Sequence, residues 1–170
     1  MKMHRDSART RRGFTTLELL IVIVMVGILA TVSLGRTSRI LASWRVNRAA
    51  QAMSEELQKG FALVGRNRKP VIIRFNKTRM VMSIRARTDT VYTQRSFGKE
   101  SEYGLDSMDV RLVKGDSSKA GIMDLEIFPP GLAADSLSIV IRKPGAYRRV
   151  RMLRGGLVQI CTDAKKHPKC

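Results

Sequence analysis

The segment Arg11-Arg12-Gly13-Phe14-Thr15-Thr16-Leu17-Glu18-Leu19-Leu20 leads directly into the apolar run Ile21-Val22-Ile23-Val24-Met25-Val26. Glu18 is the only charged residue between Phe14 and Leu34. A charged side chain inside a membrane span costs roughly 2.5–3.5 kcal/mol at the bilayer centre and less near its edge. Such a group normally has a partner of opposite charge, so the identity of that partner bears directly on function.

The apolar segment 14–34 is long enough to cross a bilayer, because roughly 21 helical residues at about 1.5 Å each cover the hydrocarbon core of about 30 Å. Three interpretations compete. A secretory signal peptide would be cut after the segment, but Leu29–Val32 offers no small-x-small cleavage site. An uncleaved membrane anchor explains the length of the apolar segment, but it does not explain the charge of Glu18 within it. A cut between Gly13 and Phe14 would create a new amino terminus four residues from Glu18.

The chain is strongly basic, with a formal net charge of +18 over 170 residues. The leader through Gly13 holds five Lys/Arg and one Asp, so most of the excess belongs to the rest of the chain. Such a surface attracts anions, which include nucleic acid, acidic lipid headgroups, lipopolysaccharide phosphates and acidic proteins. A merely solvated basic surface is the alternative, because charge by itself does not define a site.

Both cysteines, Cys161 and Cys170, lie near the C-terminus. A disulfide between them would close a short loop if the domain faces an oxidising compartment, and would contribute about 2–3 kcal/mol in the chain-entropy model. Two free thiols on a frayed tail are the alternative. A zinc site is not expected, because only His167 lies nearby and the usual close cysteine pair is missing.

The helical pattern continues beyond the apolar segment. Apolar residues recur at steps of three and four, which predicts an amphipathic helix face; they are Val46, Ala49, Ala50, Met53, Leu57, Phe61 and Val64. Polar residues occupy the opposite face, namely Arg45, Arg48, Gln51, Glu55 and Lys59. One helix is therefore expected from Phe14 to about Val64, ending near Gly60 or Gly65 and before Pro70.

After Pro70 the period changes to two, which predicts about eight short antiparallel strands covered on one face by the helix. The expected strands are Val71–Phe75, Met80–Arg85, Val91–Arg95, Met108–Val113, Asp124–Phe128, Leu137–Arg142, Tyr147–Leu153 and Leu157–Cys161. The fold class is therefore α+β. The expected organisation is a leader at 1–13, a transmembrane half-helix at 14–34, an amphipathic half-helix at 35–65 and a β-rich domain at 66–170.

The sequence offers no Ser-His-Asp or Cys-His arrangement for catalysis, because His4 lies in the leader and His167 in the tail. The adjacent pair Glu55-Glu56 is expected to lie on a solvated helix face. We therefore expect neither an enzyme, nor a metal site, nor a cofactor. A basic block does stand out near the C-terminus, from Arg142 to Arg154, with Arg149 and Arg151 on one face of their strand. Its candidate polyanion contacts are Arg148, Arg149, Arg151 and Arg154.

The segment Gly13–Val22 resembles the prepilin N-terminal motif of type IV pilins and type II secretion pseudopilins. It has a short basic leader, a glycine, a phenylalanine, a glutamate at the fifth mature position and an apolar helix. The segment Ile127–Gly131, followed by Leu137–Ile141, is similar to the C-terminal part of the H-type pseudopilin (GspH) and FimT-like minor pilin group.

This resemblance implies that a prepilin peptidase cuts after Gly13 and methylates the Phe14 amine. The subunit would sit in the inner membrane as a single-pass protein with a periplasmic C-terminal domain. With an inner-membrane assembly platform and other pilin or pseudopilin subunits, it would build a pilus or pseudopilus. Glu18 would then pair with the N-terminal ammonium of a neighbouring subunit, which suits the need of a carboxylate in low dielectric for a cation.

The resemblance also leaves a second function open. Some FimT-like relatives bind DNA for natural transformation through a C-terminal Gly-Arg-x-Arg. The corresponding turn here, Arg154–Gln159, has no arginine after its glycines, although Arg148, Arg149 and Arg151 on the preceding strand supply positive charge. Partners implied at this stage are the peptidase, other subunits, the platform, membrane lipid and, in the second case, DNA.

Overall fold

The structure is a computed structural model that describes residues 14–113 and 121–161, without the side chains of residues 32–36. The chain divides into two units, one up to Ser38 and the other from Arg39 onward. The leader, Gly13, Cys170 and the expected turn at Gly115–Ser118 lie outside the described residues.

Helix α1 (Thr16–Asn67) belongs partly to each unit. Thr15 caps its start, because the Thr15 hydroxyl accepts a hydrogen bond from the backbone N–H of Glu18 at 3.2 Å. The helix ends three residues beyond the expected Val64, with Arg68 in the left-handed region at φ 51°. A glycine such as Gly65 weakens a helix without stopping it, whereas Pro70 disfavours helical geometry in the residue before it.

In the first unit, large apolar side chains are exposed around the whole circumference of α1. They are Leu17, Leu19, Leu20, Ile21, Val22, Ile23, Val24, Met25, Val26, Ile28 and Leu29, and they follow the exposed Phe14. Among the described residues, no helix combines the length and apolarity needed to cross a membrane. The expected transmembrane half-helix is therefore not confirmed.

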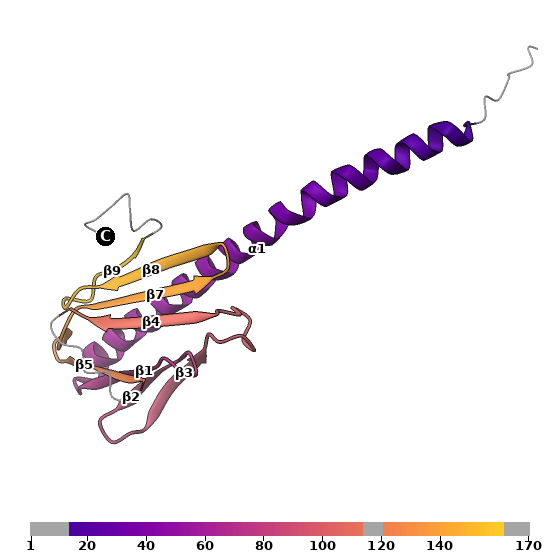
Figure 1. Ribbon diagram of the computed structural model, residues 1–170. Coiled ribbons are helices and arrows are strands. Elements are labelled where there is room, and N and C mark those ends of the chain that lie inside the picture. The colour runs from indigo at the N-terminus through magenta and orange to yellow at the C-terminus, as the bar shows by residue number, and fades with distance from the viewer. Residues whose placement is uncertain (1–13, 114–120, 162–170) are drawn as a thin grey trace, which may run out of the picture. The chain divides into compact units, whose positions relative to one another are not determined.

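The second unit contains two antiparallel sheets (Figure 1). A five-stranded sheet has the order β3-β2-β1-β5-β6, and a four-stranded sheet has the order β4-β7-β8-β9. The strands are β1 (Val71–Asn76), β2 (Val81–Ala86), β3 (Val91–Ser96), β4 (Ser107–Leu112), β5 (Ile122–Phe128), β6 (Leu132–Ala133), β7 (Leu137–Lys143), β8 (Ala146–Met152) and β9 (Val158–Cys161).

All eight expected strands are present, with ends shifted by one or two residues. The sequence pattern missed β6, because two residues are too few to display a period of two. The antiparallel arrangement is also confirmed. The division into two sheets was not predicted, because the alternation within a strand does not reveal its neighbours.

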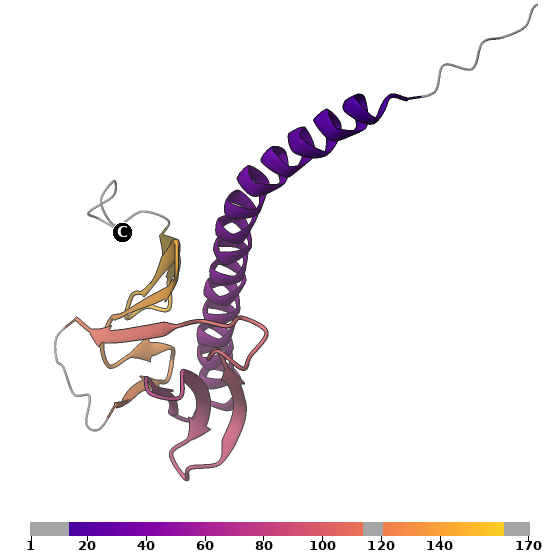
Figure 2. The same ribbon diagram turned by 45° about the vertical axis from the view of Figure 1, so that its right-hand side comes forward.

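The part of α1 from Arg39 onward lies along one side of both sheets (Figure 1; Figure 2). Val46, Ala49, Ala50, Met53 and Leu57 are all fully buried and belong to one continuous core that also contains residues of both sheets. The expected amphipathic face is therefore confirmed. Each Å² of apolar surface that this shared face buries stabilises the domain by about 25 cal/mol.

Two glycines allow the closest approaches to this helix. A β-carbon on Gly60 would lie 2.9 Å from Ile73 Cδ1, so Gly60 sits inside the helix against β1 and does not end it as expected. Gly156, in the turn before β9, has φ +84°, and a β-carbon there would lie 3.0 Å from Phe61 Cδ1. Glycine is thus required at Gly156 both by its backbone conformation and by its contact with α1.

The expectation that Glu55 and Glu56 share a solvated face is wrong for Glu56, which is only 3% exposed. Its carboxylate accepts hydrogen bonds from Lys59 Nζ at 2.9 Å and Thr93 Oγ1 at 3.0 Å, and lies 3.2 Å from Arg95 NH2. Arg95 also donates to the Tyr103 hydroxyl at 3.3 Å. Burial, chiefly, raises the pKa of Tyr103 above its ordinary value. Glu56 therefore links α1 to the edge strand β3.

We predict that Glu56→Ala lowers the free energy of unfolding by about 2 kcal/mol, because it leaves three partly buried donors without their acceptor. The partial exposure of Lys59 and Arg95 keeps the loss from being larger. Urea unfolding followed by circular dichroism measures it. The matched control is Glu55→Ala, at an exposed helix position, which should change stability by less than about 0.5 kcal/mol. Equal losses for the two variants would contradict the assignment of Glu56 as a link.

Candidate functional site

Two places deserve consideration as functional sites: the start of α1 and the outer face of the four-stranded sheet. At the first, Phe14 is 79% exposed and Glu18 lies in the first turn of the helix. The spacing of Thr15 and Glu18 is that of a capping box, and an acidic residue near a helix N-terminus is favourable. The sequence pattern Thr-x-x-Glu could have predicted this role of Glu18 at the start of the helix, but the role was not predicted.

Glu18 has no ion pair among the described residues. Its side chain is exposed within a stretch of apolar side chains that are equally exposed. A carboxylate in such surroundings can accept a cation brought by another molecule or created by a change in this chain. The predicted cleavage residue Gly13 lies outside the described residues, so the cut itself stays a prediction.

The second place is the face of the four-stranded sheet that points away from the core, which we call the basic face. Along β8, Val150 and Met152 are buried, so Arg149 and Arg151 point outward by strand alternation. Across to β7, Arg149 pairs with Val140 and Arg151 with Ser138. The outward residues of this face are Ser107, Asp109, Arg111, Ser138, Val140, Arg142, Tyr147, Arg149, Arg151 and Gln159.

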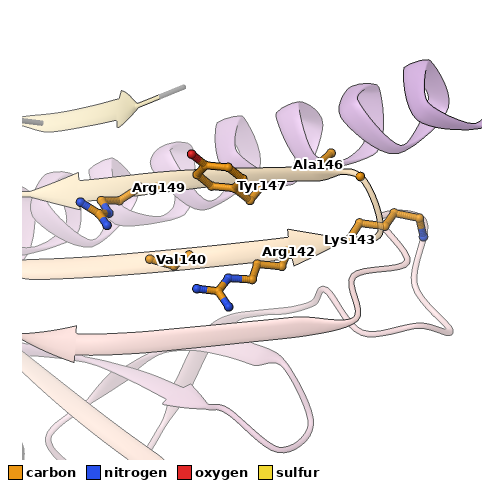
Figure 3. A pocket seen from close by; sticks show the side chains of 7 residues that line it. Val140, Arg142, Lys143, Ala146, Tyr147 and Arg149 are labelled. Carbon is orange, nitrogen blue, oxygen red and sulfur yellow. The ribbon is translucent and has the colours of Figure 1, made fainter. Parts of the chain in front are cut away.

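Within the basic face, Val140, Arg142, Tyr147 and Arg149 surround a shallow hollow that continues to the β7–β8 turn. Figure 3 shows Arg142 and Arg149 reaching from neighbouring strands on either side of Val140, with Tyr147 beside them. Among the described outward positions, Asp109 is the one acidic residue, and it forms an ion pair with Arg111 at 2.9 Å. The arginines therefore outnumber the carboxylates among these described positions.

The structure separates the four arginines expected to act together. Arg149 and Arg151 share the basic face, as predicted from their alternation. Arg148 points the other way and donates to Asn47 Oδ1 of α1 at 2.6 Å. Arg154 lies beyond the strand and donates to the backbone oxygen of Ala133 at 3.2 Å.

Two further arginines lie on the basic face. Arg142 belongs to the basic block seen in the sequence but was not among the four expected contacts; it points outward because Leu137, Ile139 and Ile141 are the buried positions of its strand. Arg111 could not be predicted from the sequence, since only the pairing of β4 with β7 brings it beside Ser138 and Arg151.

Among the described residues, neither place combines a nucleophile with a histidine base. Both histidines lie outside the described residues. In the part of the chain that the structure describes, no group of three or more His, Cys, Asp or Glu could hold a metal ion. Cys161 ends β9 and is buried, while Cys170 lies outside the described residues, so their pairing also stays a prediction.

Comparison with solved structures finds the same fold in two kinds of bacterial filament protein. The type IV minor pilin FimU of Pseudomonas aeruginosa matches with a TM-score of 0.51 and 14% identity, over 71% of this chain and 90% of that one. A second crystal form of FimU matches with a TM-score of 0.50, 13% identity and coverages of 68% and 91%. The minor pseudopilin EpsH of the Vibrio cholerae type 2 secretion system matches with a TM-score of 0.50 and 14% identity, over 69% of this chain and 97% of that one.

No protein-family model matches the sequence, and no curated protein matches it either. At the identities found, the structural similarity establishes the fold alone. The α+β, pilin-like fold expected from the N-terminal motif is therefore confirmed.

Proposed function

We propose that this chain is a minor pilin or minor pseudopilin, a structural subunit without enzymatic activity in a type IV pilus or a type II secretion pseudopilus. One observation carries the proposal. An exposed apolar helix with Glu18 in its first turn is joined to a domain with the fold of FimU and EpsH.

The apolar part of α1 supports an assembly role. Its large side chains from Leu17 to Leu29 are between 52% and 69% exposed, on all sides of the helix. Burying one such side chain fully gains roughly 1.5–3 kcal/mol, so a cover around this helix is strongly favoured. In our proposal, lipid of the inner membrane covers it first, and the helices of other subunits cover it after an assembly platform has inserted the subunit into a filament.

Glu18 selects the position of the subunit during assembly. A prepilin peptidase would cut between Gly13 and Phe14 and methylate the new amine, which keeps its positive charge. The ammonium of a neighbouring subunit would then pair with Glu18 in surroundings of low dielectric, where an unpaired carboxylate is costly. The domain from Arg39 onward would face the periplasm, where a disulfide between Cys161 and Cys170 can form and persist.

Intact-mass measurement of the chain purified from its host tests these proposed modifications together. We expect a mass lower by residues 1–13 and by two hydrogens, and higher by one CH2, because cleavage, disulfide formation and replacement of an amine hydrogen by a methyl group all occur. Reduction should restore the two hydrogens only. Replacement of Gly13 by a bulky residue should leave the leader attached. A chain that keeps its leader in a host with an active prepilin peptidase would contradict the proposed processing.

Glu18→Gln tests the charge pairing separately from the helix-starting role. Glutamine keeps the capping-box side chain and removes the charge, so helicity should be unchanged and incorporation into filaments should be lost. Incorporation is measured by the subunit content of sheared filaments at equal expression. The matched control, Glu55→Gln, changes an exposed helix position and should be incorporated normally. Normal incorporation of Glu18→Gln would contradict the proposed pairing of Glu18 with the ammonium of a neighbouring subunit.

The basic face favours a second candidate function, the binding of DNA during natural transformation. Arg149 and Arg151 lie two residues apart on one strand, about 7 Å along it, with Arg111 and Arg142 on the same face. Guanidinium groups in such a row can contact successive phosphates of a nucleic acid backbone. Tyr147 is the single aromatic side chain among them, so phosphate contacts would dominate over base stacking.

For this second candidate, we predict that the double variant Arg149→Ala/Arg151→Ala weakens binding of the full chain in detergent to duplex DNA. The slope of log K against log salt should become shallower by about 2, one for each lost phosphate contact. Fluorescence anisotropy at several salt concentrations measures both effects. The control Arg66→Ala/Arg79→Ala removes two exposed positive charges elsewhere and should keep the slope. If both double variants change the slope equally, the basic face is not the contact.

A further inference from the structure

The hollow on the basic face combines apolar surface with positive side chains. Its volume is about 450 Å³, within the range of roughly 300–1,000 Å³ that small-molecule sites occupy. Val140 contributes apolar surface, and the ring of Tyr147 beside it is 37% exposed. Arg142, Lys143 and Arg149 supply the positive charge. A hollow of this composition suits a ligand that joins a flat ring to an anionic group.

The strand register arranges four of these side chains as a checkerboard (Figure 3). Val140 lies directly opposite Arg149, and Arg142 lies directly opposite Tyr147. Directly opposite residues have their β-carbons about 5 Å apart, and diagonal neighbours are roughly 7 Å apart. Val140 and Tyr147 therefore occupy one diagonal, and the two arginines occupy the other. A flat group that lies on the first diagonal has a guanidinium on each side.

The acidic group nearest in the register does not cancel this charge. Among the described outward positions, Asp109 is the one acidic residue; it lies opposite Val140 on β4 and forms an ion pair with Arg111 at 2.9 Å. At the turn end of the hollow, the ammonium of Lys143 donates to the backbone oxygen of Gly104, which is uncharged. Cations therefore outnumber carboxylates around the hollow in the part of the chain that the structure describes.

An aromatic ring in this position distinguishes single strands of nucleic acid from duplexes. In a duplex, the bases are paired and stacked on one another, so a ring on the flat face of a sheet does not reach the faces of the bases. In a single strand, a base can turn outward and stack on an aromatic side chain. The phosphates next to that base can then accept charge-assisted hydrogen bonds from Arg142 and Arg149.

We propose that the hollow binds one unstacked base of single-stranded DNA, with the base on Tyr147 and Val140 and its flanking phosphates on Arg142 and Arg149. The inference rests on the second candidate function proposed above, because it requires the basic face to bind DNA. It adds that this face prefers a single strand to a duplex. Phosphate contacts supply most of the affinity, and the one stacked base supplies the preference.

Two oligonucleotides of equal length test the base contact with the full chain in detergent. One is a single strand of thymidines, and the other has abasic sites in place of the bases and the same number of phosphates. Fluorescence anisotropy at constant salt measures both dissociation constants. We expect the abasic strand to bind about tenfold more weakly, because it has no base to stack on Tyr147. Equal affinities for the two strands would overturn the inference.

The variant Tyr147→Leu tests the ring itself. Leucine keeps an apolar side chain but offers no flat ring, so the ratio of single-strand affinity to duplex affinity should fall about tenfold. Tyr147→Phe keeps the ring and should keep the ratio. The matched control is Tyr92→Leu on β3, which removes a tyrosine of similar exposure, 42%, from the other sheet and should also keep the ratio. Equal losses for Tyr92→Leu and Tyr147→Leu would contradict the assignment of Tyr147.

The double variant Arg142→Gln/Arg149→Gln tests the flanking phosphate contacts. With the thymidine strand, the slope of log K against log salt should become shallower by about 1.4, because each phosphate contact on a single strand contributes about 0.7. The control Arg66→Gln/Arg79→Gln removes two exposed charges elsewhere and should keep the slope. An unchanged slope for Arg142→Gln/Arg149→Gln would overturn these contacts.

The outcomes separate this inference from the DNA-binding candidate on which it rests. A chain that binds neither single strands nor duplexes overturns both. A chain that binds the thymidine strand, the abasic strand and the duplex equally well, with no effect of Tyr147→Leu, overturns the single-strand site alone.

Discussion

The apolar face of α1 is the contact on which the rest of the domain depends. Residues of both sheets meet the helix in one core. Gly60 lets the helix approach β1, Gly156 lets the β8–β9 turn close over Phe61, and Arg148 bonds to Asn47, which comes earlier on the helix. Without this face the two sheets would share few contacts beyond their connecting loops.

One face of α1 is buried in the core of the domain. The apolar side chains of α1 that stay exposed are therefore the ones that can contact other molecules. Among the described residues, the apolar side chains from Leu17 to Leu29 are exposed, and so are Ile40, Leu41 and Trp44. The first group is apolar on all sides of the helix and suits lipid or other helices. The second group is a strip on one side of a helix whose opposite side is buried in the core.

Two glutamates on the same helix illustrate how tertiary structure assigns different roles to one residue type. Glu56 is buried, and Lys59, Thr93 and Arg95 of the same chain satisfy its carboxylate. Glu18 is exposed and has no ion pair among the described residues. The carboxylate of Glu56 is satisfied within the fold, whereas Glu18 is the carboxylate for which we propose a role in assembly.

The sequence alone predicted the features that depend on local period and composition. The long helix, the antiparallel strands and the pilin-like fold class follow from apolar spacing and from the N-terminal motif, because these patterns concern residues close together in the chain. Alternation also placed Arg149 and Arg151 on one face. Tertiary structure decided how the strands divide into two sheets, that Arg111 joins those arginines, that Arg148 turns toward α1 and that Glu56 is buried. These outcomes depend on which distant segments pair, and the energy of such pairing resides in contacts that no local pattern records.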